Sequence, residues 1–320
     1  MASVPVVDIS ADPQAVGTEL DEICRTAGFF QVIGHGIPDE VARQAWTMAT
    51  RFFDLPLADK LSVARPTEDY PYGYIPMAGE ALSQSMTGSA PPDLKEVFNA
   101  GPPVPPAHGS AEPDGGWSYS LNLWPASLPG LEIAWTAYYA ALRELGDRLM
   151  SLLARGLGLP PGFFTRQIDQ SPNALRAINY PARDTAPLPG QLRAGAHTDY
   201  GTLTILRQDA VGGLEVLGAD GSWTGVEPVP GTFVINLGDL MARWTNDRWR
   251  STLHRVVDPP GAMARRQSMP YFQNANWSAR IACLPTCLDP GERPRYEPVL
   301  AGPHLMGKFR RSVAVQPDTG

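Results

Sequence analysis

The sequence has few cysteines and no apolar run long enough to cross a membrane. Cys24, Cys283 and Cys287 are odd in number and form neither a disulfide framework nor a zinc-binding pattern. We therefore expect free thiols in a reducing compartment. No apolar run approaches the roughly 18 residues of a membrane helix, and residues 1–10 lack the basic start of a secretory signal. These absences predict a soluble, cytoplasmic protein with no membrane partner.

Basic residues are also scarce. The 26 lysines and arginines, against 33 aspartates and glutamates, give a net charge of −7. Nucleic acids select basic protein faces, so this balance argues against a nucleic-acid partner. The sequence also has no basic cluster and no glycine-rich phosphate loop. We expect a small, free organic substrate, and no obligate protein partner is evident.

Turn-forming residues, in contrast, are abundant. The 31 glycines and 33 prolines make up a fifth of the 320 residues, which predicts many turns between short elements. The clearest helical periodicity covers 131–158, where leucines recur at three- and four-residue steps. Shorter helices are predicted over 18–27 and 41–53, and strands over 4–9, 29–33, 175–180, 202–206, 214–217, 232–237, 254–257 and 268–273. The pattern predicts a mostly helical first half packed against an all-β second half, a sandwich or jelly roll.

The motif His197-Thr198-Asp199 is the first candidate for chemistry. Residues i and i+2 of a strand face the same way, so an imidazole and a carboxylate would be presented together. His254 opens another short predicted strand about fifty residues later. Two histidines and one aspartate on one face of a metal leave positions open for a cosubstrate and oxygen, an arrangement typical of Fe(II) enzymes. A structural zinc site would need a fourth ligand, and none is evident.

A second pair follows close behind. Arg266 and Ser268 are again i and i+2, in a segment that begins eleven residues after His254. A guanidinium and a hydroxyl on one face make a binding pair for a carboxylate. This order of residues predicts a metal site beside a carboxylate site.

Here the sequence resembles a known family, the Fe(II)- and 2-oxoglutarate-dependent dioxygenases of the isopenicillin N synthase-like branch. The resemblance rests on His-x-Asp, then His, then Arg-x-Ser, in this order. It extends over about residues 4 to 310, through the segments VPVVDIS, AGFFQVIGHGIP, YGYIP with Glu80, DLKEVFN, GAHTDYGTLTILRQD, VGGLEV, INLGDL, TNDRWRSTLHRVV and RRQSMPYF. A short motif can arise by chance, whereas an ordered series of this length hardly can.

The resemblance implies a fold and a division of the chain. The expected class is α+β, mainly β, with a double-stranded β-helix (jelly roll) as the core and helices in the N-terminal region and at the flanks. Residues 1–120 would be the N-terminal dioxygenase region, 121–170 a long scaffold helix and 171–320 the catalytic domain.

The resemblance also implies roles for particular residues. His197, Asp199 and His254 would hold Fe(II), and Arg266 and Ser268 would bind the distal carboxylate of 2-oxoglutarate, with a further hydrogen bond from Tyr180. With O2, the site would oxidise a C–H bond of a small organic molecule (hydroxylation, desaturation or cyclisation) and release succinate and CO2. Secondary metabolism is the expected setting.

Two departures from the family pattern leave questions open. The arginine of the carboxylate pair is one residue later than the common spacing, where Arg265 stands. We choose Arg266 because only Arg266 keeps register with Ser268. In RAINYP, Ile178 stands where many relatives have Asn, so Tyr180 can equally be a core tyrosine.

The substrate end is less determined by the sequence. The aromatic residues expected to line or cover it are Tyr72, Tyr74, Phe98 and Phe272. Each of them can also be a core residue. The sequence does not indicate which C–H bond is oxidised.

Three alternatives remain at this stage. An oxidase of the same fold could use no 2-oxoglutarate, with Arg266 and Ser268 holding a substrate carboxylate. A binding protein could have kept the fold and lost the chemistry, although an intact ligand set argues against this. A hydrolase with zinc could use the same three ligands.

Overall fold

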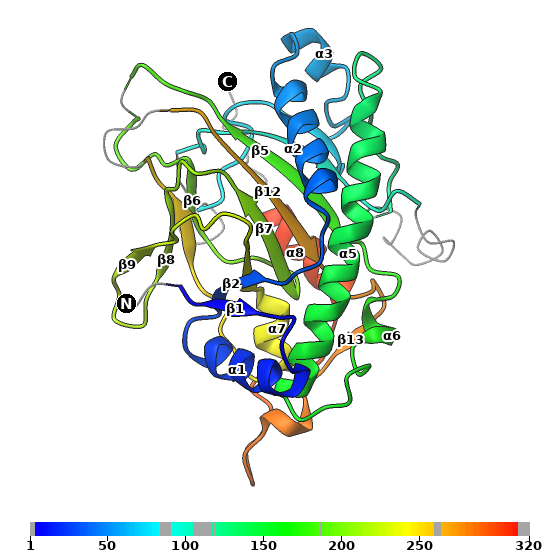
Figure 1. The fold of residues 1–320 in the computed structure, drawn as a ribbon, viewed down its shortest axis with the longest axis vertical. Helices are drawn as coiled ribbons and strands as arrows, with labels where there is room; N and C mark the ends of the chain where they lie inside the picture. The colour runs from blue at the N-terminus through cyan, green and yellow to red at the C-terminus, as the bar shows by residue number, and fades with distance from the viewer. Residues whose placement is uncertain are drawn as a thin grey trace, which may run out of the picture.

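The computed structural model describes residues 4–83, 91–104, 117, 119–185, 187–258 and 264–312. In this part of the chain two β-sheets lie beside a layer of helices (Figure 1). The large sheet has the order β1 (Val6–Asp8), β2 (Phe29–Ile33), β10 (Phe233–Leu237), β7 (Leu203–Gln208), β12 (Arg266–Gln273), β5 (Ala174–Tyr180), β4 (Glu96–Ala100) and β3 (Gly73–Ile75). The small sheet has the order β6 (Ala194–His197), β11 (His254–Val256), β8 (Leu214–Leu217) and β9 (Trp223–Gly225).

Strands of the second half alternate between the two sheets along the chain. β5, β7, β10 and β12 belong to the large sheet, whereas β6, the consecutive pair β8 and β9, and β11, which come between them, belong to the small one. The pairs that these strands form with one another are antiparallel. The chain therefore winds back and forth between two facing sheets, and side chains of alternate parity point into the space between them.

The first half of the chain contributes strands as well as helices. β1 and β2 extend the large sheet beyond β10, and β3 and β4 extend it beyond β5. The expectation of a mostly helical first half is therefore incomplete. The strands β3 and β4 are not among the strands predicted from the sequence.

Helices cover the face of the large sheet that points away from the small sheet. They are α1 (Pro13–Thr26), α2 (Asp39–Phe53), α3 (Leu57–Leu61), α5 (Gly130–Gly156) and α6 (Thr165–Ile168), and α2 and α5 run side by side (Figure 1). α1 begins five residues before its predicted start, because the Asp12 carboxylate caps it by accepting from the Ala15 N–H at 2.9 Å and Pro13 follows at the first helical position.

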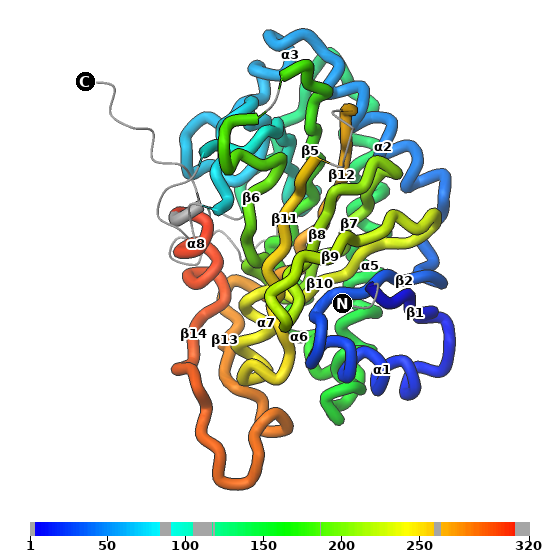
Figure 2. Tube along the Cα trace, turned by 90° about the vertical axis from the view of Figure 1, so that its left-hand side faces the viewer, coloured from blue at the N-terminus to red at the C-terminus, as the bar shows by residue number. Residues whose placement is uncertain are grey.

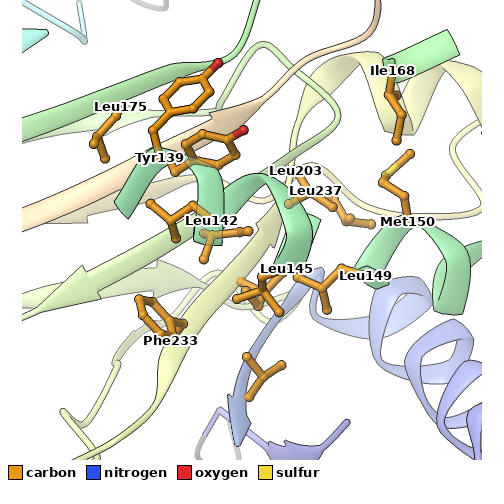
Figure 3. Close-up of a cluster of buried hydrophobic side chains, with 14 of the residues drawn as sticks. Tyr139, Leu142, Leu145, Leu149, Met150, Ile168, Leu175, Leu203, Phe233 and Leu237 are labelled. Atoms are coloured by element: carbon orange, nitrogen blue, oxygen red, sulfur yellow. The ribbon is translucent and has the colours of Figure 1, made fainter. Parts of the chain in front are cut away.

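The main hydrophobic core lies between α5 and the large sheet. The leucines of the predicted apolar face of α5 are buried, and Figure 3 shows them next to residues of β7 and β10. They include Leu142, Leu145 and Leu149 from the helix and Leu203, Phe233 and Leu237 from the strands. The helices pack against one face of the large sheet. The opposite face of that sheet lines the space between the two sheets.

The last elements lie on one side of the molecule (Figure 2). α7 (Asp239–Trp244) follows β10. β13 (Arg280–Ile281) and β14 (Val299–Leu300) pair as a small separate sheet around the short 3-10 helix η2 (Pro285–Cys287), and α8 (Ala301–Ser312) follows. Among the described residues, the helices are too short or too polar to span a bilayer.

Candidate metal centre and active site

Two histidines and one aspartate converge between the sheets. His197 is the last residue of β6 and lies opposite His254, the first residue of β11, in an antiparallel pair. Their ring centroids are 4.3 Å apart. Asp199 Oδ1 lies 3.9 Å from Nε2 of His197 and 3.8 Å from Nε2 of His254, and one ligand atom from each residue lies within 4.8 Å of the others. The three groups can therefore share one ion.

The two imidazoles are held in the orientation that a metal requires. Nδ1 of His197 lies 2.7 Å from the Gly195 carbonyl and Nδ1 of His254 lies 3.1 Å from the Thr252 carbonyl. A carbonyl can only accept, so each Nδ1 carries the proton and each Nε2 keeps its lone pair. Burial, and then the neighbouring His254, lower the pKa of His197 to about 4, which keeps this ring neutral near pH 7.

The aspartate is oriented by two polar residues that the sequence analysis did not identify. Asp199 Oδ2 accepts hydrogen bonds from the Thr204 hydroxyl and, at 2.7 Å, from the Asn236 amide. Oδ1 is thereby left facing the two imidazoles. Burial alone would raise the pKa of Asp199, but the two histidines and these hydrogen bonds outweigh it and lower the pKa. One anionic oxygen and two neutral nitrogens are a donor set that suits Fe(II).

The pair predicted to bind a carboxylate lies on the facing sheet. Arg266 and Ser268 are buried on β12, with Arg266 opposite Tyr180 of β5, and all three line the cavity between the sheets. Arg266 donates to the Gly212 carbonyl at 2.8 Å and to Gln208 Oε1 at 3.3 Å. Its guanidinium carbon lies 4.9 Å from the centre of the Tyr180 ring.

This arginine is 1 % exposed and has no acidic partner among the described residues. Its Nη1 also has no hydrogen-bond partner there. A buried, uncompensated guanidinium is costly unless an anion joins it. The structure thus provides a place for a ligand carboxylate at the level of Arg266.

The neighbouring Arg265 points the other way. It donates to Asn179 Oδ1 at 2.7 Å and pairs with Asp54 at 2.5 Å, outside the cavity. Alternation along β12 separates the two arginines, since Arg266, Ser268 and Phe272 line the cavity and Arg265 does not. Arg266 therefore faces the cavity and Arg265 does not, and the role of Arg266 stays a prediction.

The four expected substrate residues separate into two groups. Tyr72 and Phe272 line a cavity of about 190 Å³ that also contains the metal candidates. Tyr74 and Phe98 do not line it. They lie opposite each other in the β3–β4 pair and pack in the helix-side core with Phe52, so the expectation for these two residues is corrected. For Phe98, parity explains this, because the next residue on β4, Asn99, lines the cavity.

A buried charged network lines the same cavity and was missed at the sequence level. Arg176 forms a two-pronged ion pair with Glu80 (both distances 3.1 Å) and donates from Nε to Asn99 Oδ1 at 2.7 Å. Lys95 lies 3.3 Å from Glu80 and 2.9 Å from Asp93. The residues come from β5, β4 and the segment before β4, so only the fold brings them together.

Glu80 makes this network sensitive to acid. Burial alone would raise its pKa, but Arg176 and Lys95 outweigh it and hold the pKa of Glu80 at about 2. A depressed carboxylate pKa stabilises the fold above the unfolded-state pKa of about 4.5. This contribution, on the order of 3 kcal/mol, is lost as pH falls from about 4.5 to about 2. In urea titrations, Glu80→Gln should therefore cost stability at pH 7 and much less near pH 2.5. An equal cost at both pH values would contradict the ionised pair.

Comparison with known proteins agrees with this site. Residues 4–127 match the family model described as non-haem dioxygenase in morphine synthesis N-terminal, and residues 172–275 match that of the 2OG-Fe(II) oxygenase superfamily. The chain belongs to the family of Fe(II)- and 2-oxoglutarate-dependent oxygenases.

Individual relatives extend over most of the chain. It is 36% identical over 303 residues to the 2-oxoglutarate-Fe(II) type oxidoreductase hxnY of Emericella nidulans, which covers 92% of this chain and 84% of the relative. It is also 36% identical to the validamycin A dioxygenase of Streptomyces hygroscopicus subsp. limoneus, with 88% and 80% covered. The structure resembles that of a full-length Neurospora crassa protein solved in complex with alpha-KG (2-oxoglutarate) and thymine, with a TM-score of 0.85, 30% identity and 96% of each chain covered.

These findings confirm the class that the sequence predicted. The protein is a non-haem dioxygenase that uses Fe(II), 2-oxoglutarate and O2 to oxidise a small molecule, with release of succinate and CO2. The alternative that uses no 2-oxoglutarate is not favoured, because structurally similar relatives bind alpha-KG.

Proposed function

We propose that His197, Asp199 and His254 are the three iron ligands of this dioxygenase, and that Arg266 with Ser268 binds the distal carboxylate of 2-oxoglutarate. The observation that carries the proposal is the pairing of a neutral-imidazole and carboxylate triad with a buried arginine that has no acidic partner among the described residues. Bound iron supplies the activation of O2 that is coupled to decarboxylation of 2-oxoglutarate.

The protein's own residues would bind and orient the reactants. Arg266 would hold the distal carboxylate of 2-oxoglutarate by opposite charge and by directional hydrogen bonds. Tyr180 beside it would be a further hydrogen-bond donor. Asn236 and Thr204 would keep Asp199 turned toward the iron. Apolar residues between the sheets, among them Leu206 and Val256, would exclude water from the reacting groups.

The alternation of strands between two facing sheets supports a double-stranded β-helix as the core. We also retain the division into an N-terminal region (1–120), a scaffold helix (121–170) and a catalytic domain (171–320) as a proposal. The N-terminal strands complete the large sheet at both edges, so we expect these parts to unfold together. A cytoplasmic location stays a prediction.

The substrate is proposed to be a small molecule held at the outer part of the cavity, against Tyr72 and Phe272. Both residues line that cavity. The relative named for validamycin A and the relative bound to thymine support a small organic substrate. We expect no obligate protein partner.

Two measurements together test the proposed function. Fe(II) and 2-oxoglutarate added without oxygen should give a visible absorption band that needs both, and oxygen should then yield one succinate for each 2-oxoglutarate consumed. Substitution of Zn(II) for Fe(II) should abolish turnover. Substrate oxidation that proceeds without any 2-oxoacid, or full activity with zinc, would overturn the proposal.

A further prediction concerns the strand that carries His197. β6 lies at the edge of the small sheet, and the Gly195 N–H on its free side donates to Asp93 Oδ1 at 2.8 Å. The Gly195 carbonyl in turn accepts from His197. Asp93→Asn removes the charge that pairs with Lys95 and so weakens the contact that supports Gly195 and, through it, the orientation of His197. We therefore expect Fe(II) binding to weaken by about 10- to 100-fold.

The control for this prediction is Asp21→Asn. Asp21 is also largely buried and ion-paired, with Arg248 at 2.8 Å, but it lies on α1 outside the cavity. Anaerobic titration with Fe(II) should show weaker binding for the Asp93 variant alone. Equal affinities in the two variants, with both folded, would assign Asp93 to general stability.

A further inference from the structure

The outer part of the cavity carries a charged surface that the proposed function does not use. Arg176, on β5, lies four residues before Tyr180, which places the two about 13 Å apart along the strand. Arg176 and Ile178 line the cavity with Tyr180, so these side chains lie at successive depths of the same space. Glu80 and Asn99 line the cavity at the same depth as Arg176. We call these three residues, Arg176, Glu80 and Asn99, the outer polar wall.

The outer polar wall offers donors and acceptors side by side. In the described residues the Arg176 guanidinium uses three of its five N–H groups, one toward Asn99 and two toward Glu80. Two N–H groups remain, next to the Glu80 carboxylate and the Asn99 amide. The side chains of Glu80 and Arg176 are 11 % and 15 % exposed, so they are buried but reachable from the cavity.

The charges of this part of the cavity are already balanced. Arg176 and Lys95 are matched by Glu80 and Asp93. Among the residues that the structure describes, the remaining charged ones that line the cavity are Asp199 and Arg266. With Fe(II) and doubly charged 2-oxoglutarate bound, the charges at those two residues also sum to zero. Arg65 does not line the cavity; the carboxylates that act on it are Glu80 and, more weakly, Glu68, whose charge balances that of Arg65.

Balanced charge decides which substrates fit. An anionic substrate at the remaining N–H groups would lie next to the like-charged Glu80 carboxylate, and a cationic substrate would lie next to the like-charged Arg176 guanidinium. A molecule without net charge meets neither penalty and can use the remaining N–H groups together with a neighbouring acceptor. The flat apolar sides of such a molecule would face Tyr72, Phe272 and Phe309, which also line the cavity.

Resting on the proposed function, we infer that the outer polar wall is the substrate subsite, and that it selects a neutral or zwitterionic nitrogen-containing molecule, such as an amide, lactam or imide, over a simple carboxylic acid. Amide-like groups carry a donor and an acceptor on one edge, which is the complement of the wall.

The inference is tested with pairs of probes that match in size and shape and differ in charge and in the amide N–H donors: benzamide and benzoate, and phenylacetamide and phenylacetate, with thymine as a cyclic imide. Binding is measured without oxygen, as the change that each probe causes in the visible band of the Fe(II)–2-oxoglutarate complex. The wild-type protein should bind each amide at least about 10-fold more tightly than the matching acid. Tighter binding of the acids, or no binding of any neutral probe, overturns the inference.

Charge variants of the wall make the test specific. Glu80→Gln frees Arg176 and adds a net positive charge, so the ratio of acid to amide affinity should rise by about 10-fold or more. Asn99→Asp should shift the ratio the opposite way and favour benzamidine over benzamide. Glu215→Gln, which breaks the ion pair with Arg255 on the small sheet, is the control and should leave the ratios unchanged.

The outcomes separate the subsite from the proposed function. Where the visible band forms but neither wall variant changes the ratios, the subsite is wrong and the iron and 2-oxoglutarate roles stand. Where the wild-type protein forms no such band, the proposed function fails, and the inference fails with it. Because the two variants act in opposite directions, poor folding of one leaves the other to decide.

Discussion

Asp199→Ala is expected to abolish turnover. Asp199 supplies the only carboxylate of the three-residue site, and its Oδ1 lies within 4 Å of both imidazole Nε2 atoms. Removal of this ligand leaves two neutral nitrogens and no charge to balance Fe(II). A metal centre that lowers the activation barrier by about 4 kcal/mol raises the rate by roughly 10³-fold. The rate of turnover should therefore fall by at least about 10³-fold. His197→Ala and His254→Ala should have comparable effects.

The measurement is succinate release at limiting iron, together with anaerobic Fe(II) titration. His35→Gln is the control, because His35 lies outside the cavity, contacts the Gly231 carbonyl at 3.2 Å and packs edge-on against Phe233. It should keep both iron binding and rate. A wild-type rate at limiting iron in any of the three ligand variants would contradict the assignment.

The order of the site residues was readable from the sequence, but the geometry behind it was only partly foreseen. His197 and Asp199 were expected to share a strand face. In the structure β6 ends at His197, and Asp199 follows beyond the strand. What turns the carboxylate inward is its pair of hydrogen bonds with Thr204 and Asn236, which come from two other strands. No local pattern in the sequence reports such contacts.

Elements with strong periodicity were predicted well, and those without it were not. The helix predicted over 131–158 is α5 at Gly130–Gly156, since repeated leucines define one face regardless of context. His197 was expected on a strand with Asp199, but the strand β6 over Ala194–His197 was not predicted, because these four residues include no β-branched one. β6 exists because β11 pairs with it and because Asp93 occupies its free edge at Gly195.

The buried network at the outer part of the cavity shows a different limit. Glu80, Lys95 and Arg176 are separated by up to about a hundred residues, and each, taken alone, resembles an ordinary surface charge. Their burial follows from the pairing of β4 with β5, which sets Asn99 opposite Arg176. Without that register, the sequence alone does not bring these charges together.

Arg266→Ala tests the second half of the site and is expected to raise the requirement for 2-oxoglutarate by about 100-fold or more. Breaking a buried, hydrogen-bonded charge pair costs on the order of 3 kcal/mol, and about 1.4 kcal/mol is a factor of ten in affinity. The measurement is the 2-oxoglutarate dependence of succinate release, with thermal unfolding as a check, since the variant also loses the contact with the Gly212 carbonyl.

Arg265→Ala is a closely matched control, one residue away with its side chain on the other face. It loses the pair with Asp54 and the contact with Asn179, both outside the cavity, so its 2-oxoglutarate requirement should stay close to wild type. If the Arg265 variant instead shows the larger increase, the carboxylate site has been placed one residue too late. If Arg266→Ala raises only the substrate requirement, Arg266 binds the substrate, as in an oxidase that uses no 2-oxoglutarate. The alternation of β12 argues against the first of these outcomes, because it directs Arg266 and Ser268 into the cavity together and Arg265 away from it.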